Sequence, residues 1–167
     1  MTAIITNIAR APRATTAPMV RGRSIHLIDI ENICGSSQPS RHEVEHARAR
    51  YNEWVPVGNL DQVVVASSRG NLMSAYIGWP GVRYLTQDGK DGADIRLARV
   101  MLEEGVAQRF GAVVLASGDG GLAPFVAHLA TQGLSTTVVS PADRLSREMR
   151  MAAHKCIVLT PELEDIA

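Results

Sequence analysis

The chain has 167 residues, 46% of them hydrophobic, and its 17 basic and 17 acidic side chains leave no formal net charge. This length and composition exclude a wholly disordered chain and suit one domain with a sizeable core. No run of about 18 apolar residues occurs, which argues against a membrane span, and two cysteines, Cys34 and Cys156, are too few for a disulfide scaffold. We therefore expect a globular cytoplasmic protein with no membrane partner.

Residues 1–23 differ from the rest of the chain. They contain Arg10, Arg13, Arg21 and Arg23 and no acidic residue, which leaves 13 basic and 17 acidic groups in residues 24–167. The segment is also rich in Ala, Thr and Pro and shows no sustained periodicity. The sequence therefore predicts a basic, disordered arm over 1–23 and a single domain over 24–167.

From residue 24 onward, short apolar runs alternate with segments of helical periodicity. Ser40 precedes Glu43 by three residues, the spacing of a capping box at a helix start. Gly105 and Gly133 stand where two helices should end. In chain order we expect a strand at 25–30, a helix at 40–54, a strand at 62–66, a helix at 71–77, a strand at 82–86, a helix at 91–104, a strand at 112–117, a helix at 121–132, a strand at 134–140, a helix at 144–153 and a strand at 156–159.

Several of the expected strands are apolar on both faces, as in 62–66 (QVVVA) and 112–117 (AVVLAS). Such strands, alternating with amphipathic helices, predict a parallel sheet covered on both sides. Because crossovers between parallel strands are right-handed, the predicted fold class is α/β, a doubly wound three-layer α/β/α sandwich with a mainly parallel five- or six-stranded sheet. In such sheets the ligand site lies beyond the carboxyl ends of the strands.

Acidic residues follow three of the expected strands. Asp29 ends the first, Asp91 and Asp94 follow the third, and Asp119 follows the fourth in a Ser-Gly-Asp run. Neighbouring strands lie about 4.8 Å apart, so Asp29 and Asp119 can share a cation if the first and fourth strands pair. Carboxylates crowded in one crevice repel each other, and Mg²⁺, which binds through one or two carboxylates and several waters, removes that cost.

Helix capping is the alternative explanation for these acids. An aspartate at the end of a strand often caps the next helix, and Asp29, Asp94 and Asp119 could each do only that. Convergence of all three at one edge of the sheet favours a shared site over three independent caps.

Four short motifs, in order over residues 24–160, resemble those of NYN domains, which are PIN-like ribonucleases. Residues 29–32 (DIEN) resemble the opening D-x-x-N, and residues 91–98 (DGADIRLA) resemble a K-G-x-D-x-x-L-A helix start. Residues 113–119 (VVLASGD), with Pro124, Phe125 and Gly133 after them, resemble the S-G-D segment, and residues 145–149 resemble a late S-x-x-L helix. The resemblance implies a PIN-like, Rossmannoid fold.

The resemblance also implies metal-dependent hydrolysis of RNA phosphodiesters, that is, an Mg²⁺- or Mn²⁺-dependent endoribonuclease. Asp29, Asp94 and Asp119 would hold the Mg²⁺ or Mn²⁺ ion, with Asp91 as a further candidate ligand. Asn32 would hold a carboxylate or phosphate oxygen, and Ser117 would orient a carboxylate or the metal-bound water. The implied partner is RNA, single-stranded or structured.

The chain departs from the family pattern at the fourth acid. Gly121 stands where the family commonly places an acid two residues after the S-G-D aspartate, Leu122 replaces a usual aromatic, and Asp91 stands where a Lys is common. A domain with fewer carboxylates could be a weakened member that only binds RNA or serves as an assembly module. The endo or exo mode and a homodimer stay open.

Basic residues could grip a nucleic-acid backbone beside the acidic crevice. The candidates are Arg41, Arg48, Arg69 and Arg96. The alternative for the first helix is an ordinary solvated face, in which its arginines pair with its own glutamates. A different enzyme class would treat residues 117–121 (SGDGG) as a phosphate cradle of the kind seen in lipid and NAD kinases. That interpretation leaves Asp29 and Asp94 without a role.

Overall fold

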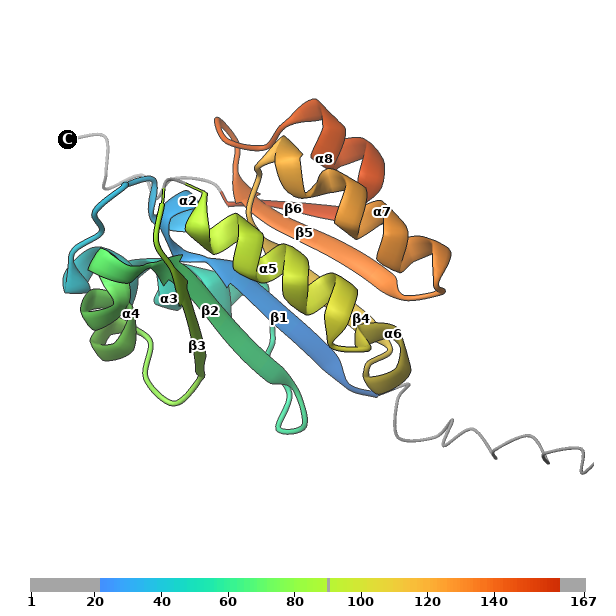
Figure 1. Ribbon diagram of the computed structural model, residues 1–167, viewed down its shortest axis with the longest axis horizontal. Helices are drawn as coiled ribbons and strands as arrows, with labels where there is room; N and C mark the ends of the chain where they lie inside the picture. The colour runs from blue at the N-terminus through green and yellow to red at the C-terminus, as the bar shows by residue number, and fades with distance from the viewer. Residues whose placement is uncertain (1–21, 90, 160–167) are drawn as a thin grey trace, which may run out of the picture.

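The computed structural model describes residues 22–89 and 91–159, so the predicted arm lies outside the described residues except for Gly22 and Arg23. In this part of the chain, six parallel strands form one sheet in the order β3-β2-β1-β4-β5-β6 (Figure 1). The strands are β1 (Ser24–Asp29), β2 (Gln62–Ser68), β3 (Arg83–Gln87), β4 (Ala112–Ala116), β5 (Ser135–Pro141) and β6 (Lys155–Leu159). The α/β fold class and the six-stranded parallel sheet are confirmed.

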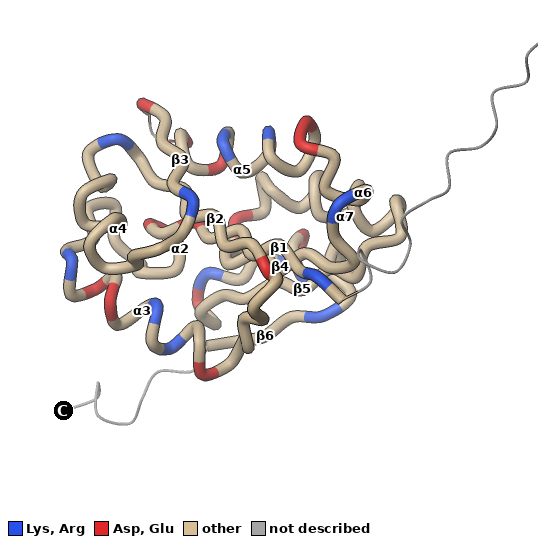
Figure 2. The backbone as a smooth tube through the Cα atoms, turned by 90° about the horizontal axis from the view of Figure 1, so that it is seen from below, with Lys and Arg blue, Asp and Glu red and all other residues tan. Residues whose placement is uncertain are grey.

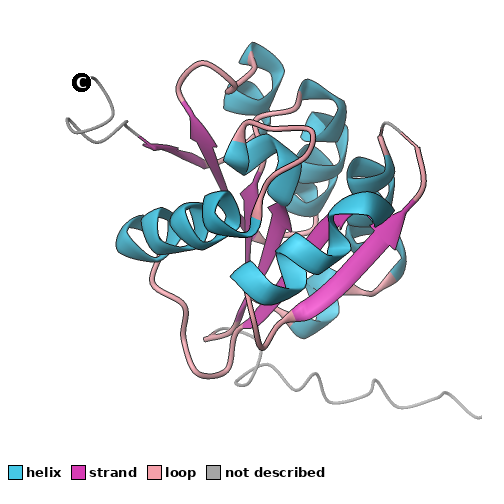
Figure 3. Cartoon of the chain, turned by 90° about the vertical axis from the view of Figure 1, so that its left-hand side faces the viewer, coloured by secondary structure: helices cyan, strands magenta, loops and turns pink. Residues whose placement is uncertain are grey.

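Helices cover both faces of the sheet (Figure 3). One face carries α2 (Ile30–Cys34), α3 (Arg41–Trp54) and α4 (Leu72–Gly78), which follows the 3₁₀ turn η1 (Arg69–Asn71). The other face carries α5 (Gly92–Glu103), α6 (Val106–Arg109), α7 (Ala123–Thr131) and α8 (Arg147–Ala152), with the 3₁₀ turn η2 (Gly120–Leu122) before α7. The result is the predicted α/β/α sandwich.

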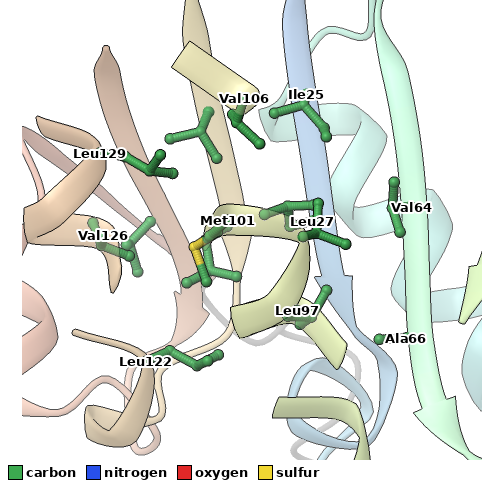
Figure 4. Close-up of a cluster of buried hydrophobic side chains, with 14 of the residues drawn as sticks. Ile25, Leu27, Val64, Ala66, Leu97, Met101, Val106, Leu122, Val126 and Leu129 are labelled. Atoms are coloured by element: carbon green, nitrogen blue, oxygen red, sulfur yellow. The ribbon is translucent and has the colours of Figure 1, made fainter. Parts of the chain in front are cut away.

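The sheet separates two buried clusters because successive side chains of a strand point to opposite faces. On β1, Ile25 and Leu27 join the larger cluster under α5 to α8, whereas Ile28 joins the cluster under α2 to α4. Figure 4 shows Leu97 and Met101 of α5 packed over β1 in the larger cluster. These cores hold the carboxyl ends of the central strands in fixed register.

The predicted elements are present with small shifts of their ends. Ser40 caps α3, and the predicted capping box is complete, since Ser40 Oγ accepts from the Glu43 N–H and Glu43 accepts from the Ser40 N–H. Gly105 and Gly133, both at positive φ, follow α5 and α7. The short helices α2 and α6 were not predicted. No helix among the described residues is long and apolar enough to cross a membrane.

One polar group lies inside the core near the amino ends of the strands. His26, on β1, is 1% exposed. Its Nδ1 lies 2.7 Å from the hydroxyl of Tyr51 on α3, and its Nε2 lies 3.2 Å from a carboxylate oxygen of Asp61. Burial lowers the pKa of His26, which keeps the ring neutral and bonded on both sides.

Candidate active site

A pocket of about 500 Å³ opens at the carboxyl ends of the central strands, the edge at which the ligand site is predicted. β1 and β4 are neighbours, as the sharing of a cation requires. The polar side chains that line the pocket are Asp29, Glu31, Asn32, Ser36, Ser37, Ser68, Asp91, Asp94, Asp119 and Arg144. The structure thus brings the predicted aspartates and Asn32 together, and Ser117 lies buried behind them.

Asp29 is 5% exposed and ends β1. One carboxylate oxygen accepts a hydrogen bond from the Asn32 N–H at 3.2 Å and so caps α2, and the other accepts from the Ser117 hydroxyl at 3.1 Å. Burial, followed by the nearby charge of Asp94, raises the pKa of Asp29 to about 7. The ionised carboxylate is therefore destabilised as long as no cation lies beside it.

Asp94 lies in the first turn of α5, where helix capping does not explain it. The capping position belongs to Asp91, whose side chain makes no capping hydrogen bond. Burial, followed by the charges of Asp119 and Asp91, raises the pKa of Asp94 to about 6. Its Oδ1 is buried and has no hydrogen-bond partner. An oxygen in this state is suited to a cation.

The loop that carries Asp119 is fixed by side chains rather than left open to a ligand. Asn32 Oδ1 accepts from the Gly118 N–H at 3.0 Å, Ser117 Oγ from the Asp119 N–H at 3.3 Å, and Asp119 Oδ1 from the Gly121 N–H at 2.7 Å. A kinase-like phosphate cradle would need these N–H groups for its ligand. The loop is therefore built to hold Asp119, not to hold a phosphate by its backbone.

Glu31 adds a carboxylate to the same pocket. Its Oε1 accepts hydrogen bonds from the Ser68 N–H and from the Asn71 side chain, both at 2.7 Å, while its Oε2 is buried without a partner. Glu31 thus has one oxygen fixed by the end of β2 and one oxygen left for a ligand. In the sequence, Glu31 of the DIEN run is, with Asp91, a candidate for the charge that is missing at position 121.

These residues fit a hard divalent cation bound with part of its water shell. Asp94 and Glu31 each offer a buried oxygen without a partner, and no Lys or Arg of the described residues forms an ion pair with Asp29, Asp94 or Asp119. Across 22–89 and 91–159, no three His, Cys, Asp or Glu side chains form a group that could hold a metal ion by themselves. Mg²⁺ needs only one or two carboxylates and keeps several waters, so two of these carboxylates are enough for it.

Two of the four predicted RNA-binding arginines are held by surface ion pairs. Arg69, after β2, pairs with Asp88 at 3.1 Å, and both lie at the carboxyl edge of the sheet. Arg41 pairs with Glu45 at 2.7 Å on the exposed side of α3. Figure 2 shows basic and acidic positions along α3, as expected for a solvated helix face.

The other two arginines do not line the acidic pocket. Arg48 lines a separate pocket beside Gln62 and Arg83, at the amino ends of β2 and β3. Arg96 lies in the second turn of α5, and its charge acts on Glu104, just past the far end of that helix. The expectation that Arg48 flanks the acidic crevice is therefore wrong.

The comparisons with known proteins agree with the geometry. The sequence profile of the NYN domain matches residues 27–160. The chain belongs to the NYN family. NYN domains are PIN-like ribonucleases that generally depend on divalent metal ions and act on RNA.

A solved structure of a protein of unknown function from Vibrio parahaemolyticus is similar to this NYN domain. The TM-score is 0.53 at 15% sequence identity, and the match covers 83% of this chain and 93% of that chain. At this identity the likeness shows the fold alone. None of the curated proteins matches the chain.

The position where this NYN domain lacks an acid lies beside the aspartates. A second hollow of about 390 Å³ shares Asp91, Asp94 and Asp119 with the acidic pocket, and Gly121 lines it. A Cβ on Gly121 would lie 3.2 Å from Asp119 Oδ1, the end of a flexible side chain, and the backbone of Gly121 has no positive φ. The backbone there does not require glycine.

Arg144 is a charged residue of the acidic pocket that sequence reasoning missed. It follows β5, lines the acidic pocket and donates to the Gly35 carbonyl at 3.0 Å. Its own carbonyl lies so close to Gly118 that a Cβ there would stand 2.2 Å away, so the loop of this NYN domain packs directly on the Arg144 backbone. The strand-end argument, applied to β5 as it was to β1 and β4, would have found it.

Proposed function

We propose that this NYN domain is an Mg²⁺- or Mn²⁺-dependent endoribonuclease. The observation that carries the proposal is the group of Asp29, Asp94 and Asp119 on one pocket, where burial and mutual repulsion raise the pKa of the first two. Raised carboxylate pKa values at a cleft, with no basic partner, are typical of functional sites.

Each residue of the site has a role that follows from its position. Asp29, Asp94 and Asp119, with Asp91 at the rim, would hold the cation, and Glu31 offers a further oxygen. Ser117 keeps Asp29 oriented by its hydrogen bond. A bound divalent ion lowers the pKa of a coordinated water and polarises a phosphate oxygen.

Two side chains fix the site against the neighbouring loops. Asn32 accepts from the Gly118 N–H and so fixes the end of β1 to the loop after β4. Arg144 places a permanent positive charge on the wall of the same pocket, where it can contact a phosphate of the RNA backbone.

The test is cleavage of RNA by the purified chain with Mg²⁺, with Mn²⁺ and with excess chelator. A circular single-stranded RNA separates endonuclease from exonuclease activity, because it has no ends. We expect cleavage with metal only, and a loss of at least about 100-fold for Asp94→Asn, in line with the weight of electrostatic terms in catalysis. Glu53→Gln, an exposed change on α3, is the control and should cleave as the wild type does.

Gly121 favours a second candidate, an RNA-binding or assembly module without cleavage. The missing family acid lowers the charge available for metal. In that case the chain would bind RNA, yet no metal would produce cleavage, and Asp94→Asn would leave RNA binding unchanged or tighter.

A further inference from the structure

A second pocket of about 490 Å³ lies at the amino ends of the strands, at the edge of the sheet opposite the acidic site. Its charged lining contains three arginines from separate elements and a single acid. Arg23 precedes β1, Arg48 lies on α3 and Arg83 begins β3, while Asp61 is the acid.

The acid of this pocket is already engaged. Asp61 accepts hydrogen bonds from the Ser24 N–H and the Gly58 N–H, both at 2.7 Å, and lies 3.2 Å from His26 Nε2. These bonds lower the pKa of Asp61 against the opposing effect of its burial. The Asp61 carboxylate is thus already bonded to the loop before β2 and to the buried histidine.

Arg83 already has an acidic partner, which leaves Arg23 and Arg48 as the two other arginines of the pocket. Arg83 forms two hydrogen bonds of 2.6 Å with Glu104. Neither Arg23 nor Arg48 forms an ion pair with any acid in the described part of the chain. The Arg23 guanidinium lies 4.7 Å from the centroid of the Phe110 ring, and its Nε is buried with no hydrogen-bond partner.

We propose that this pocket is a second ligand site, which binds a phosphate group through Arg23 and Arg48. Planar guanidinium groups match phosphate oxygens in geometry and charge. The side chains of Asn52 and Gln62 line the same pocket and can donate further hydrogen bonds. The volume falls in the range of about 300–1,000 Å³ typical of ligand sites.

The phosphate belongs either to a free nucleotide or to the backbone of an RNA that extends around the molecule. Both sources offer the same chemistry to the two arginines. The site is distinct from the proposed ribonuclease centre, because it lies at the other end of the strands and contains no free carboxylate. It therefore binds without a divalent metal.

The test is calorimetric titration of the full chain in excess chelator with pyrophosphate, with a mononucleotide and with a ten-residue oligouridylate. Without metal, the acidic pocket repels all three ligands. We expect binding by the wild type and at least tenfold weaker binding by Arg23→Gln and by Arg48→Gln. Arg150→Gln, an exposed arginine on α8 that lines neither this pocket nor the acidic one, is the matched control and should bind as the wild type does.

The salt dependence separates the two sources. If the site takes the RNA backbone, the oligonucleotide binds tighter than the mononucleotide, and each lost arginine lowers the slope of log K against log salt by about 0.7. If it takes a free nucleotide, the mononucleotide binds as well as the oligonucleotide. Absence of binding by the folded wild type, or equal binding by the Arg23 and Arg48 variants, would overturn the proposal. A failure to cleave RNA bears only on the other site.

Discussion

Asp29 combines two roles that sequence reasoning treated as alternatives. It caps α2 through the Asn32 N–H, and it faces the acidic pocket beside Asp94. The cap alone would leave the second oxygen free for water, but that oxygen accepts from the buried Ser117 hydroxyl. Asp29 accepts a hydrogen bond on each oxygen, yet its pKa is still raised to about 7, so its ionised form is destabilised. A cation bound beside it would stabilise that form.

Asp29→Asn should stabilise the metal-free protein, and more so at high pH. The pKa of Asp29 is raised to about 7 in the folded chain, so ionisation of Asp29 costs the wild type stability as pH rises from about 4 to 7, and the variant lacks this contribution. A pKa difference of one is worth about 1.4 kcal/mol. We expect a gain at pH 8 of at least about 1 kcal/mol, or about 2–4 °C in Tm, and a smaller gain at pH 5. Thermal unfolding in chelator measures both, and an equal gain at the two pH values would contradict this account.

Gly121→Asp should tighten metal binding. The new carboxylate would join Asp91, Asp94 and Asp119 on the shared hollow, and affinity for hard cations rises with ligand charge. We expect at least a several-fold lower Kd for Mn²⁺ by calorimetry, and faster RNA cleavage if the chain cleaves. Gly121→Asn, with the same shape and no charge, is the control. A Kd unchanged by Asp in a folded protein would place position 121 outside the site.

The acids of the pocket were predicted from the sequence, and Arg144 was missed although the same argument applies to it. Asp29 ends β1, Asp119 stands three residues past β4, and Asp94 lies in the first turn of the helix after β3, so parallel pairing carries them to one edge. Arg144 stands three residues past β5, but the sequence pattern assigned it to a helix at 144–153, whereas α8 begins at Arg147. The prediction for Arg48 was wrong for a different reason. α3 runs back along the sheet, and at 1.5 Å per residue it carries Arg48 about 10 Å beyond Arg41.

At the scale of elements, α3 is fixed to the sheet by a buried polar contact as well as by packing. The Tyr51 hydroxyl meets His26 on β1, and His26 meets Asp61 before β2. Tyr51 also packs against Trp79, with ring centroids 5.6 Å apart. The Tyr51 hydroxyl thus connects α3 to β1 and, through His26, to the segment before β2.

Tyr51→Phe should destabilise the fold while leaving the packing of the ring. It removes the partner of His26 Nδ1, and an unsatisfied buried polar group costs about 1–3 kcal/mol. Urea unfolding at pH 7.5 measures the loss. Tyr76→Phe, which removes an exposed hydroxyl, should change the free energy of unfolding by no more than about 0.5 kcal/mol. A Tyr51 variant as stable as the wild type would show that water replaces the hydroxyl.

The elements missed in the sequence were the shortest. α2 has five residues and α6 has four, too few to show the 3.6-residue repeat that identified α5, whereas α3 was identified by its capping box. α2 nonetheless positions Glu31 and Asn32 at the acidic pocket, because the helix begins directly after its cap, Asp29, at the end of β1. The order of the strands also had to come from the structure, since the pairing of the first and fourth strands entered the sequence argument only as a condition for a shared cation.

For the molecule as a whole, removal of a bound divalent ion should lower stability. A ligand that binds only the folded state at 100 times its Kd adds about 2.7 kcal/mol. We therefore expect Mn²⁺ to raise the Tm of the wild type at pH 7.5, and excess chelator to reverse the increase. Asp94→Asn should show most of this increase lost, whereas Glu53→Gln should keep it. An equal increase in Asp94→Asn would place the metal elsewhere.

The order of the strands in the sheet also determines at which stage of folding the acidic pocket forms. β1 pairs with β4 across residues such as Ser24 and Ala112, and Asn32 reaches Gly118 across 86 positions of the chain. Contacts between such distant residues form late and slowly in folding, because a long loop must close first. A chain still in synthesis therefore carries the Asp29 half of the pocket without its Asp119 half. The nascent protein has no assembled site until β4 and the loop after β5 have been made.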